Sequence, residues 1–231
     1  IYAAVSAAAV SEATDLSNTA INPSSVTITA SENGIMTTLT DLARNSAPRN
    51  VAADIGKLFG EAIAKKIDTD LTALFDGFST AVGAADAALT VAKLFESVAN
   101  LRNSAVPIND VSAVLHPMIA YDLKANLTNT FANSNANDLS NEALRNGFVG
   151  RIAGVPIFET SNLANTGTTG DYKNGVFHRD ALGLAMMQDL KIETQRDASL
   201  RADEIVATAV YGVGELHDSY GIELLADSSI Q

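Results

Sequence analysis

The clearest pattern in the chain is a row of apolar side chains within residues 51–76. Apolar residues recur there about every four positions, which is the spacing of one face of an α-helix. A helix of this length would run about 39 Å at about 1.5 Å per residue, which is longer than an average globular helix. The row consists of Ile55, Phe59, Ile63, Ile67, Leu71 and Phe75. It predicts one long helix with a single buried face, ended by Gly77 and Gly83.

Two short runs rich in Thr, Val and Ile precede this helix. They cover residues 26–30 and 35–40, and they flank the pair Asn33-Gly34. An Asn-Gly pair between such runs is a strong β-hairpin signal, because both residues tolerate the positive φ of a tight turn. Few of the side chains are large and apolar, so the predicted hairpin has no core of its own. We therefore expect it to reach out to something else.

After the long helix, helical and strand-like segments follow in irregular order. Residues 90–102 have helical spacing, residues 111–116 form an apolar run typical of a buried strand, and Pro117 suits the first turn of a further helix. Asp180 is a candidate cap of a short helix at 181–187. Further β segments are predicted at 147–158, 176–178, 190–195, 205–211 and 221–225. This mixed order predicts an α+β fold.

Composition narrows the class of protein. The 231 residues are 47% apolar and 18% charged, which is typical of a folded chain with one large domain or two small interleaved ones. The chain has no cysteine, which excludes disulfides, thiolate metal sites and cysteine nucleophiles. No apolar run reaches the roughly 18–20 residues that cross a bilayer. The net charge of −12 argues against binding to nucleic acid phosphates, although acidity can equally serve solubility.

Motifs of catalysis or cofactor binding are weak in this sequence. The Gly-rich stretch 147–154 fits neither G-x-x-x-x-G-K-[ST] nor G-x-G-x-x-G, so we interpret its glycines as turn or bulge positions. The three histidines lack metal-motif spacing. His116 is expected to be a hydrogen-bonded core or edge residue, His178 is badly placed to pair with Asp180, and His217 is expected to be solvated. We predict no catalytic, cofactor or metal site.

Seven short segments, taken in their order along the chain, resemble segments of a known protein family. They are Val26-Thr-Ile-Thr-Ala30, Thr40-Asp-Leu-Ala43, the helix end Ile67-Asp68, Val114-Leu-His-Pro117, Gly150-Arg-Ile-Ala-Gly-Val-Pro-Ile-Phe158, Phe177-His-Arg-Asp-Ala-Leu182 and Leu200-Arg-Ala-Asp-Glu-Ile-Val-Ala-Thr-Ala-Val-Tyr-Gly212. In this order they resemble the major capsid proteins of tailed bacteriophages, from about residue 1 to 225. Each segment alone is a weak signal, and their common order makes the likeness specific.

The resemblance implies the phage capsid fold that encapsulins share, with an extended loop hairpin, a peripheral domain and an axial domain. The peripheral domain has a long spine helix and a β-sheet, and the axial domain has a mixed sheet plus helices. The implied divisions are an N-terminal arm at 1–21, the extended loop hairpin at 22–47, the spine helix at 48–83, the axial domain at 84–187, the returning peripheral strands at 188–214 and the axial C-terminal tail at 215–231.

The implied function is structural rather than enzymatic. Many copies, as pentamers and hexamers, would form an icosahedral shell that encloses double-stranded DNA without sequence-specific binding. The resemblance also implies a portal, possible scaffolding or decoration proteins, no membrane, assembly in the host cytoplasm and a final place in the virion. An encapsulin-like compartment is the first alternative, and a soluble α+β enzyme or binding protein is the second.

Contacts between copies are expected in and after the extended loop. The candidate residues are Val26, Ile28, Asn33, Gly34, Ile35, Met36, Arg44 and Arg49. Some relatives cross-link covalently through a lysine of this loop, but the first lysine of this chain is Lys57. We therefore expect non-covalent contacts. Family members often lose an N-terminal segment to a maturation protease, which makes Ile1 a candidate cleavage point.

Overall fold

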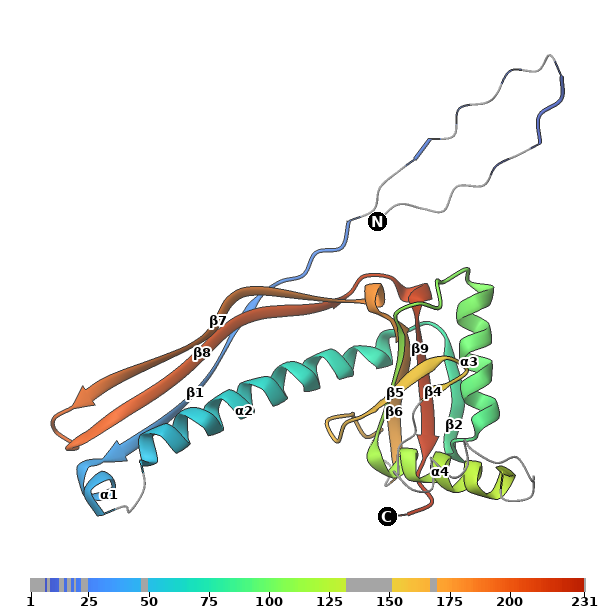
Figure 1. The fold of residues 1–231 in the computed structure, drawn as a ribbon. Coiled ribbons are helices and arrows are strands. Elements are labelled where there is room, and N and C mark those ends of the chain that lie inside the picture. Colours follow the sequence, from blue (N-terminus) through green and yellow to red (C-terminus); the bar gives the residue numbers. More distant parts are fainter. Residues whose placement is uncertain are drawn as a thin grey trace.

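The protein has an elongated region and a compact region, as Figure 1 shows. This computed structural model describes residues 25–46, 50–131, 151–166 and 170–230, with a few positions before 25, and it leaves out the side chains of 126–131. The elongated region holds one long helix and three strands. The compact region holds a second sheet and two further helices.

The elongated region is a three-stranded antiparallel sheet with a helix along it. The strand order is β1-β8-β7, so β8 lies in the middle and the other two strands form the edges. The turn between β7 and β8 and the short helix α1 lie together at the far tip (Figure 1). The elements are β1 (Ser31–Thr40), α1 (Asp41–Ser46), α2 (Val51–Ala73), β7 (Leu182–Asp197) and β8 (Ala202–Glu215).

The long helix is confirmed, and its apolar face packs on β8. Phe59 is buried with Ile205 of β8 and with Leu39 of β1. Ile63, one turn further on, is buried with Tyr211. Side chains of β8 alternate between buried and half-buried because successive residues of a strand point to opposite faces. The predicted stripe therefore finds its partner within the same chain.

The predicted hairpin at Asn33-Gly34 is wrong. Residues 31–40 form one continuous strand that pairs with β8 over its full length, with Ser31 opposite Tyr211 and Thr40 opposite Ala202. Gly34 does not adopt the positive φ that a tight hairpin turn needs. The long edge of β8 offers hydrogen-bonding partners to every second residue along the whole segment, whereas a hairpin of two short runs would satisfy fewer groups. Residues 26–30 lie in no strand.

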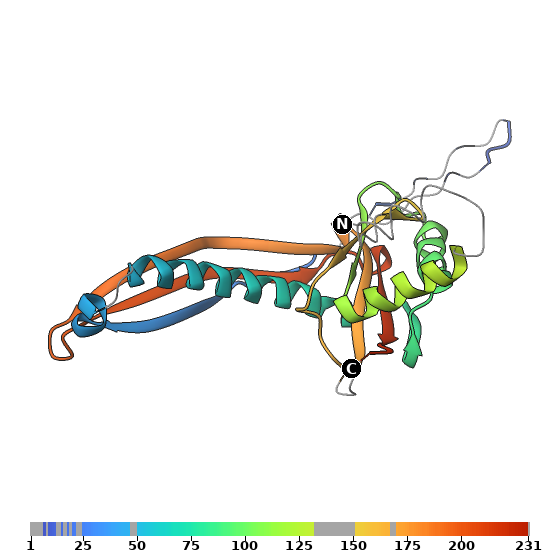
Figure 2. The same cartoon turned by 60° about the horizontal axis from the view of Figure 1, so that its bottom comes forward.

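The compact region is a six-stranded mixed sheet in the order β2-β9-β6-β3-β5-β4. Figure 2 shows its two helices, α3 and α4, on the side away from the elongated region. Their apolar faces form the largest core of the molecule with the sheet. The elements are β2 (Ala81–Ala88), α3 (Val91–Asn103), β3 (Val111–Leu115), α4 (Pro117–Phe131), β4 (Arg151–Ile152), β5 (Val155–Glu159), β6 (Asp171–His178) and β9 (Gly221–Asp227).

Several predictions for this region hold. Helix α3 begins after Thr90, whose side chain accepts a hydrogen bond from the Lys93 amide. Strand β3 leads directly into α4, and Pro117 occupies the first helical position as predicted. The described helices include none long and apolar enough to span a membrane.

Two expectations are wrong. Residues 182–187 belong to β7 rather than to a short helix, because Leu182 to Met186 pair with the end of β8. A short apolar run does not reveal its structure by periodicity alone. A 3-10 turn, Arg179–Ala181, precedes β7. Its cap is His178, whose Nδ1 accepts a hydrogen bond from the Asp180 amide at 3.2 Å. Asp180 therefore lies inside the turn instead of capping it.

The two regions are joined by an aromatic cluster at the end of α2. The helix tightens into a 3-10 turn, Leu74–Gly77, that carries Phe75. The ring centroid of Phe75 lies 5.1 Å from that of Phe177 in β6 and 6.3 Å from that of Phe78. Phe75 and Phe78 are both buried. The cluster lies on the face of the compact sheet opposite to α3 and α4, so it connects the long helix to the sheet.

A pair of acidic side chains also lies at this junction. Glu215 ends β8, and Asp218 accepts a hydrogen bond from the Ser79 amide at 2.7 Å. Burial raises the pKa of Glu215, and the charge of Asp218 and a hydrogen bond to it raise this pKa further. Ionised Glu215 therefore opposes folding, and the folded chain binds this proton more tightly than the unfolded chain does.

We expect Glu215→Gln to stabilise the protein at pH 7. The glutamine is neutral and can still donate to Asp218, so it resembles protonated Glu215. The gain should be below about 1 kcal/mol, because the side chain is half-exposed and water screens the charge. As pH falls through the raised pKa, wild-type Glu215 takes up its proton and the difference should shrink. Unfolding curves between pH 5 and 8 measure this, and parallel curves for the two proteins would contradict it.

Candidate inter-subunit surface

A row of exposed apolar side chains follows the edge strand β7. Their exposed fractions run from 40% at Leu190 to 80% at Met187. One edge of β7 pairs with β8, and the other has no strand partner among the described residues. The row, which we call the β7 surface, consists of Leu184, Met186, Met187, Leu190 and Ile192. Exposed apolar groups beside an unpaired strand edge are typical of a surface that another chain covers.

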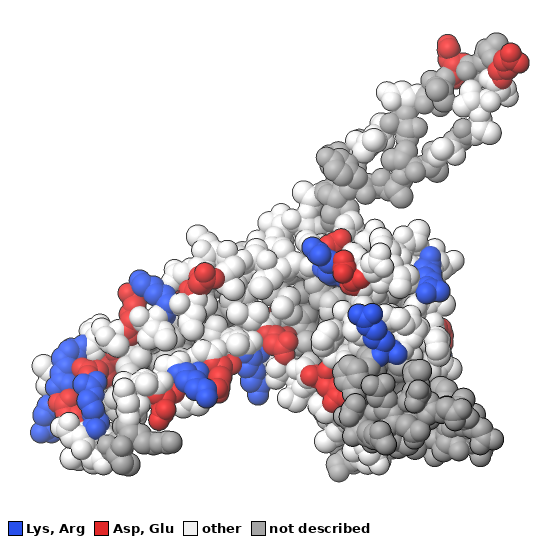
Figure 3. Space-filling model, in the orientation of Figure 1, with Lys and Arg blue, Asp and Glu red and all other residues white. Residues whose placement is uncertain are grey.

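Charged side chains are sparse over the part of the β7 surface nearer the compact region, whereas the exposed residues Asp189, Lys191 and Glu193 flank Leu190 and Ile192. Figure 3 shows Lys, Arg, Asp and Glu gathered at the tip and along α2, while the stretch over β7 and β8 nearer the compact region is mostly uncharged. Fully burying an exposed large apolar side chain contributes about 1.5–3 kcal/mol, and a side chain that is already half-buried contributes correspondingly less. A row of five such side chains therefore offers a substantial driving force for association.

The predicted contact residues lie mainly along the opposite edge, β1. Asn33 is half-buried, while Gly34, Ile35 and Met36 are exposed. Ile35 lies opposite Ala207 on the face that α2 covers, and Met36 lies opposite Val206 on the other face. These predicted residues thus line the second free edge of the sheet.

Val26 and Ile28 precede β1 and differ in their surroundings. Val26 is exposed, with 44% of its surface accessible. Ile28 is half-buried, and its side chain lies over the strand glycines Gly183 and Gly214. The backbone carbonyl of Thr29 lies against Gly212 in the same way. Part of the Ile28 side chain is therefore buried by its own chain, and only the rest is available for contact with another copy.

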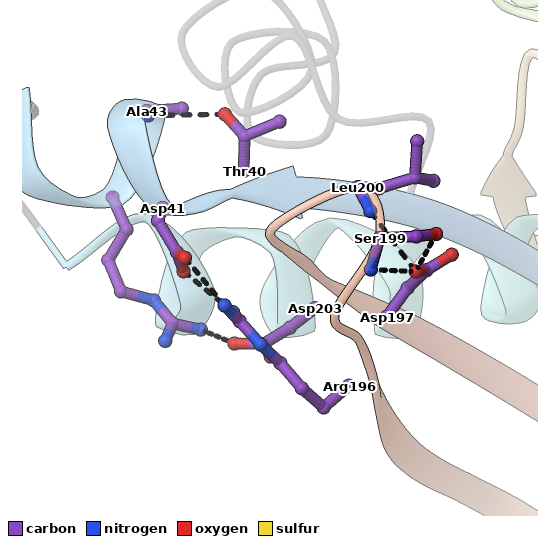
Figure 4. A network of polar contacts seen from close by, with 9 residues as sticks. Thr40, Asp41, Ala43, Arg196, Asp197, Ser199, Leu200 and Asp203 are labelled. Atoms are coloured by element: carbon purple, nitrogen blue, oxygen red, sulfur yellow. Dashed lines mark hydrogen bonds and ion pairs between the residues drawn. The ribbon is translucent and has the colours of Figure 1, made fainter.

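Charged residues hold the tip together, as Figure 4 shows. Arg196 of β7 donates to both carboxylate oxygens of Asp41, at 2.7 and 2.6 Å, and to Asp203 at 3.3 Å. Arg44, one of the predicted contact residues, forms an ion pair with Asp203. The hydrogen bond from Arg196 holds the pKa of Asp41 below its ordinary value. Arg49, the last predicted residue, lies outside the described residues.

The turn between β7 and β8 is fixed by its own side chains. Asp197 Oδ1 accepts from the amides of Ser199, at 2.8 Å, and Leu200, at 3.1 Å (Figure 4). The hydrogen bond to the Ser199 side chain lowers the pKa of Asp197. Thr40 Oγ1 accepts from the Ala43 amide at 3.2 Å at the start of α1. The tip is therefore an ordered structure that can serve as a contact.

The histidines serve the fold. His116 is buried, as predicted, and stacks on Tyr172 with ring centroids 3.6 Å apart, while burial lowers the pKa of His116. His178 caps the 3-10 turn described above and meets Tyr220 edge-on. His217 stacks on Tyr220 and is half-buried rather than fully solvated.

Sequence reasoning missed the β7 surface. The sequence predicts a short helix at 181–187, and the alternation at 190–195 indicates a half-exposed strand with one apolar face in contact with a core. In the structure α2 covers β8 and leaves most of β7 exposed. The signal that could have revealed this surface is the run Leu182-Gly-Leu-Ala-Met-Met187, which contains no polar side chain and is unusual for a strand with a solvated edge.

Within the described part of the chain, the long narrow sheet has two edges without a strand partner and an uncovered apolar row, which is typical of a subunit of a larger assembly. The family described as "Phage capsid protein" matches residues 3–222. The chain belongs to this family, and the predicted capsid fold is confirmed. It is a structural protein of the virion shell, where it assembles with further copies of itself.

Solved structures show the same fold at low identity. The capsid of cyanophage P-SCSP1u aligns with a TM-score of 0.77 and 20% identity, over 99% of this chain and 82% of that one. The protein from Mycobacterium phage Che8 aligns at 0.74 and 20%, over 91% and 76%. The encapsulin complex from Synechococcus elongatus aligns at 0.68 and 13%, over 87% and 75%. No match is found among curated proteins.

Proposed function

We propose that this chain is the major capsid protein of a tailed bacteriophage and that its copies form an icosahedral shell around double-stranded DNA. The uncovered β7 surface carries the proposal, because an exposed apolar row beside an unpaired strand edge is typical of a surface that another chain buries. The family match supports the same reading. The shell would be held by non-covalent contacts and would have no catalytic site.

The proposed divisions follow the two regions. Strand β1 with the residues before it would be the extended loop, assigned to 22–47. The rest of the elongated region would be the peripheral domain, assigned to 48–83 and 188–214, and the compact region would be the axial domain, assigned to 84–187 and 215–231. The arm would cover 1–21. The strands suggest moving the boundaries to Ala81, where β2 starts, and Leu182, where β7 starts.

The net charge of −12 suits a container wall that does not grip its contents, because phosphates repel carboxylates. Assembly would take place in the host cytoplasm with a portal and with scaffolding or decoration proteins, and no membrane would take part. An encapsulin-like compartment with a protein cargo is the second candidate, supported by the encapsulin likeness. Analysis of particle contents distinguishes the two, because DNA supports a capsid and a protein cargo supports a compartment.

We expect Met187→Asp to abolish particle formation. The change places a carboxylate in the β7 surface, and burying it against another copy would cost several kcal/mol per contact. Since about 1.4 kcal/mol is a factor of ten, particle yield should fall at least tenfold at equal protein concentration. Negative-stain microscopy and size exclusion measure the yield, and circular dichroism should show an unchanged fold.

Lys57→Gln is a matched control for this test. The Lys57 side chain is 79% exposed on α2, close to the exposure of Met187, and its replacement changes the net charge by the same one unit. Particles should form in this variant. Normal particle yield with Met187→Asp would refute the proposed contact. Boiled particles should run as a single monomer band in SDS, and a covalent ladder would refute a non-covalent shell.

A further inference from the structure

Three aspartates from different parts of the sequence meet at one end of the compact sheet. Asp86 lies in β2, Asp171 begins β6 and Asp227 ends β9, which are three neighbouring strands. Asp171 and Asp227 are directly opposite each other in the antiparallel pair. Each aspartate offers a carboxylate oxygen, and these oxygens all lie within 4.8 Å of one another. Like charges directly opposite on neighbouring strands destabilise a sheet, so this arrangement needs compensation.

Two of the carboxylate oxygens are buried and accept no hydrogen bond from the part of the chain that the structure describes. They are Oδ2 of Asp171, a residue only 1% exposed, and Oδ1 of Asp227. The Asp86 amide donates to the other oxygen of Asp171 at 3.0 Å. The ion pairs of the described residues include none of the three aspartates. Buried carboxylates without donors are costly unless a cation compensates them.

The backbone makes room for this convergence. Gly170 has a φ of +97°, and a Cβ added there would lie only 2.3 Å from Asp227 Oδ1. Any other residue would therefore push that oxygen away from the cluster. Asp86 also has a positive φ, 59°, within the irregular part of β2 where the pairing with β9 shifts register. The Ser228 amide donates to the Gly170 carbonyl at 2.9 Å and keeps the end of β9 beside the start of β6.

We propose that Asp86, Asp171 and Asp227 form a calcium site that fastens the ends of β2, β6 and β9. Calcium prefers carboxylate and carbonyl oxygens at about 2.3–2.6 Å in flexible geometry. The three carboxylate oxygens lie within 4.8 Å of one another, so one ion bound at about 2.4 Å from each oxygen could contact all three. Magnesium needs shorter bonds of about 2.0–2.1 Å and a regular octahedron. Because the site lies in the compact region, it is independent of the β7 surface.

The test is thermal unfolding of the full chain in excess EGTA and in 1 mM CaCl2, together with a calorimetric titration with CaCl2. We expect one calcium ion per chain and a rise in the unfolding midpoint of about 5 °C or more. Asp171→Asn should lose this rise. In EGTA the same variant should be at least as stable as the wild type, because the new amide can donate to Asp227. Asp86→Asn should also lose the rise, because Asp86 is exposed and asparagine adopts its positive φ as readily as aspartate does.

Asp122→Asn is the matched control. Asp122 is also buried, but its carboxylate accepts hydrogen bonds from the amide and hydroxyl of Ser229. This variant should lose stability in both media and keep the full calcium-dependent rise. The proposal is overturned if calcium does not raise the wild-type midpoint, or if Asp171→Asn and Asp86→Asn respond as strongly as the wild type. Neither result bears on particle formation, so the two proposals fail separately.

Discussion

Phe75→Ala is expected to lower the free energy of unfolding by about 3–5 kcal/mol. The ring is 1% exposed and lies between the end of α2 and the compact sheet, in contact with Phe78 and Phe177. Truncation removes this contact area and leaves a cavity that the sheet cannot fill, because Gly175 directly beneath the ring has no side chain to move into it. The packing that is lost lies at the junction of the two regions, so the contact between the long helix and the compact sheet should be weakened.

Urea unfolding of the unassembled chain, followed by circular dichroism, measures this loss. Phe95→Ala provides the comparison, because Phe95 is a phenylalanine on α3 that is half accessible to solvent. Its replacement should cost less than about 1 kcal/mol. Equal effects at the two positions would show that Phe75 does not hold the junction together.

Gly221→Ala is expected to destabilise the chain by about 1–3 kcal/mol or more, although it adds a single methyl group. A Cβ at this position would lie 2.1 Å from the ring of Phe78, far inside van der Waals contact. The ring is buried, so it can make room only by displacing its neighbours. The expected cost is therefore one of overpacking, opposite in kind to the cavity left by Phe75→Ala.

Gly56→Ala offers a control of opposite sign. Gly56 lies inside α2, and a Cβ there would meet nothing within 4 Å. Alanine should stabilise the helix by about 0.5–1 kcal/mol, because glycine loses more conformational freedom on folding. Urea unfolding of both variants gives the comparison. If Gly221→Ala were neutral or stabilising, the packing described for Phe78 would be wrong.

The parts of the fold that could be predicted have strong local signals. The spacing from Ile55 to Phe75 determined α2, and Pro117 marked the start of α4. Strand β2 was missed because its residues are mostly Ala, Gly and Asp, which are uncommon in strands. It forms because β9 offers it an edge.

The errors arise where a distant partner decides the structure. Asn33-Gly34 has the composition of a turn, but β8 supplies a complete edge to pair with, and this edge lies far along the sequence. The contact residues proposed from sequence were therefore placed on a hairpin, whereas the structure places most of them on or beside a strand edge. The three aspartates at 86, 171 and 227 are too far apart in sequence for any motif to reveal them.

The chain that leads into and along β1 is held by packing contacts at two points, and these contacts fix the number of residues between them. Ile28 rests on Gly183 and Gly214, and eleven positions later Leu39 is buried with Phe59. One inserted residue between them would either lift Ile28 from its glycines or turn Leu39 to the opposite side of the sheet, since neighbouring strand residues alternate. An insertion anywhere between Ile28 and Leu39 is therefore expected to remove one of these two contacts.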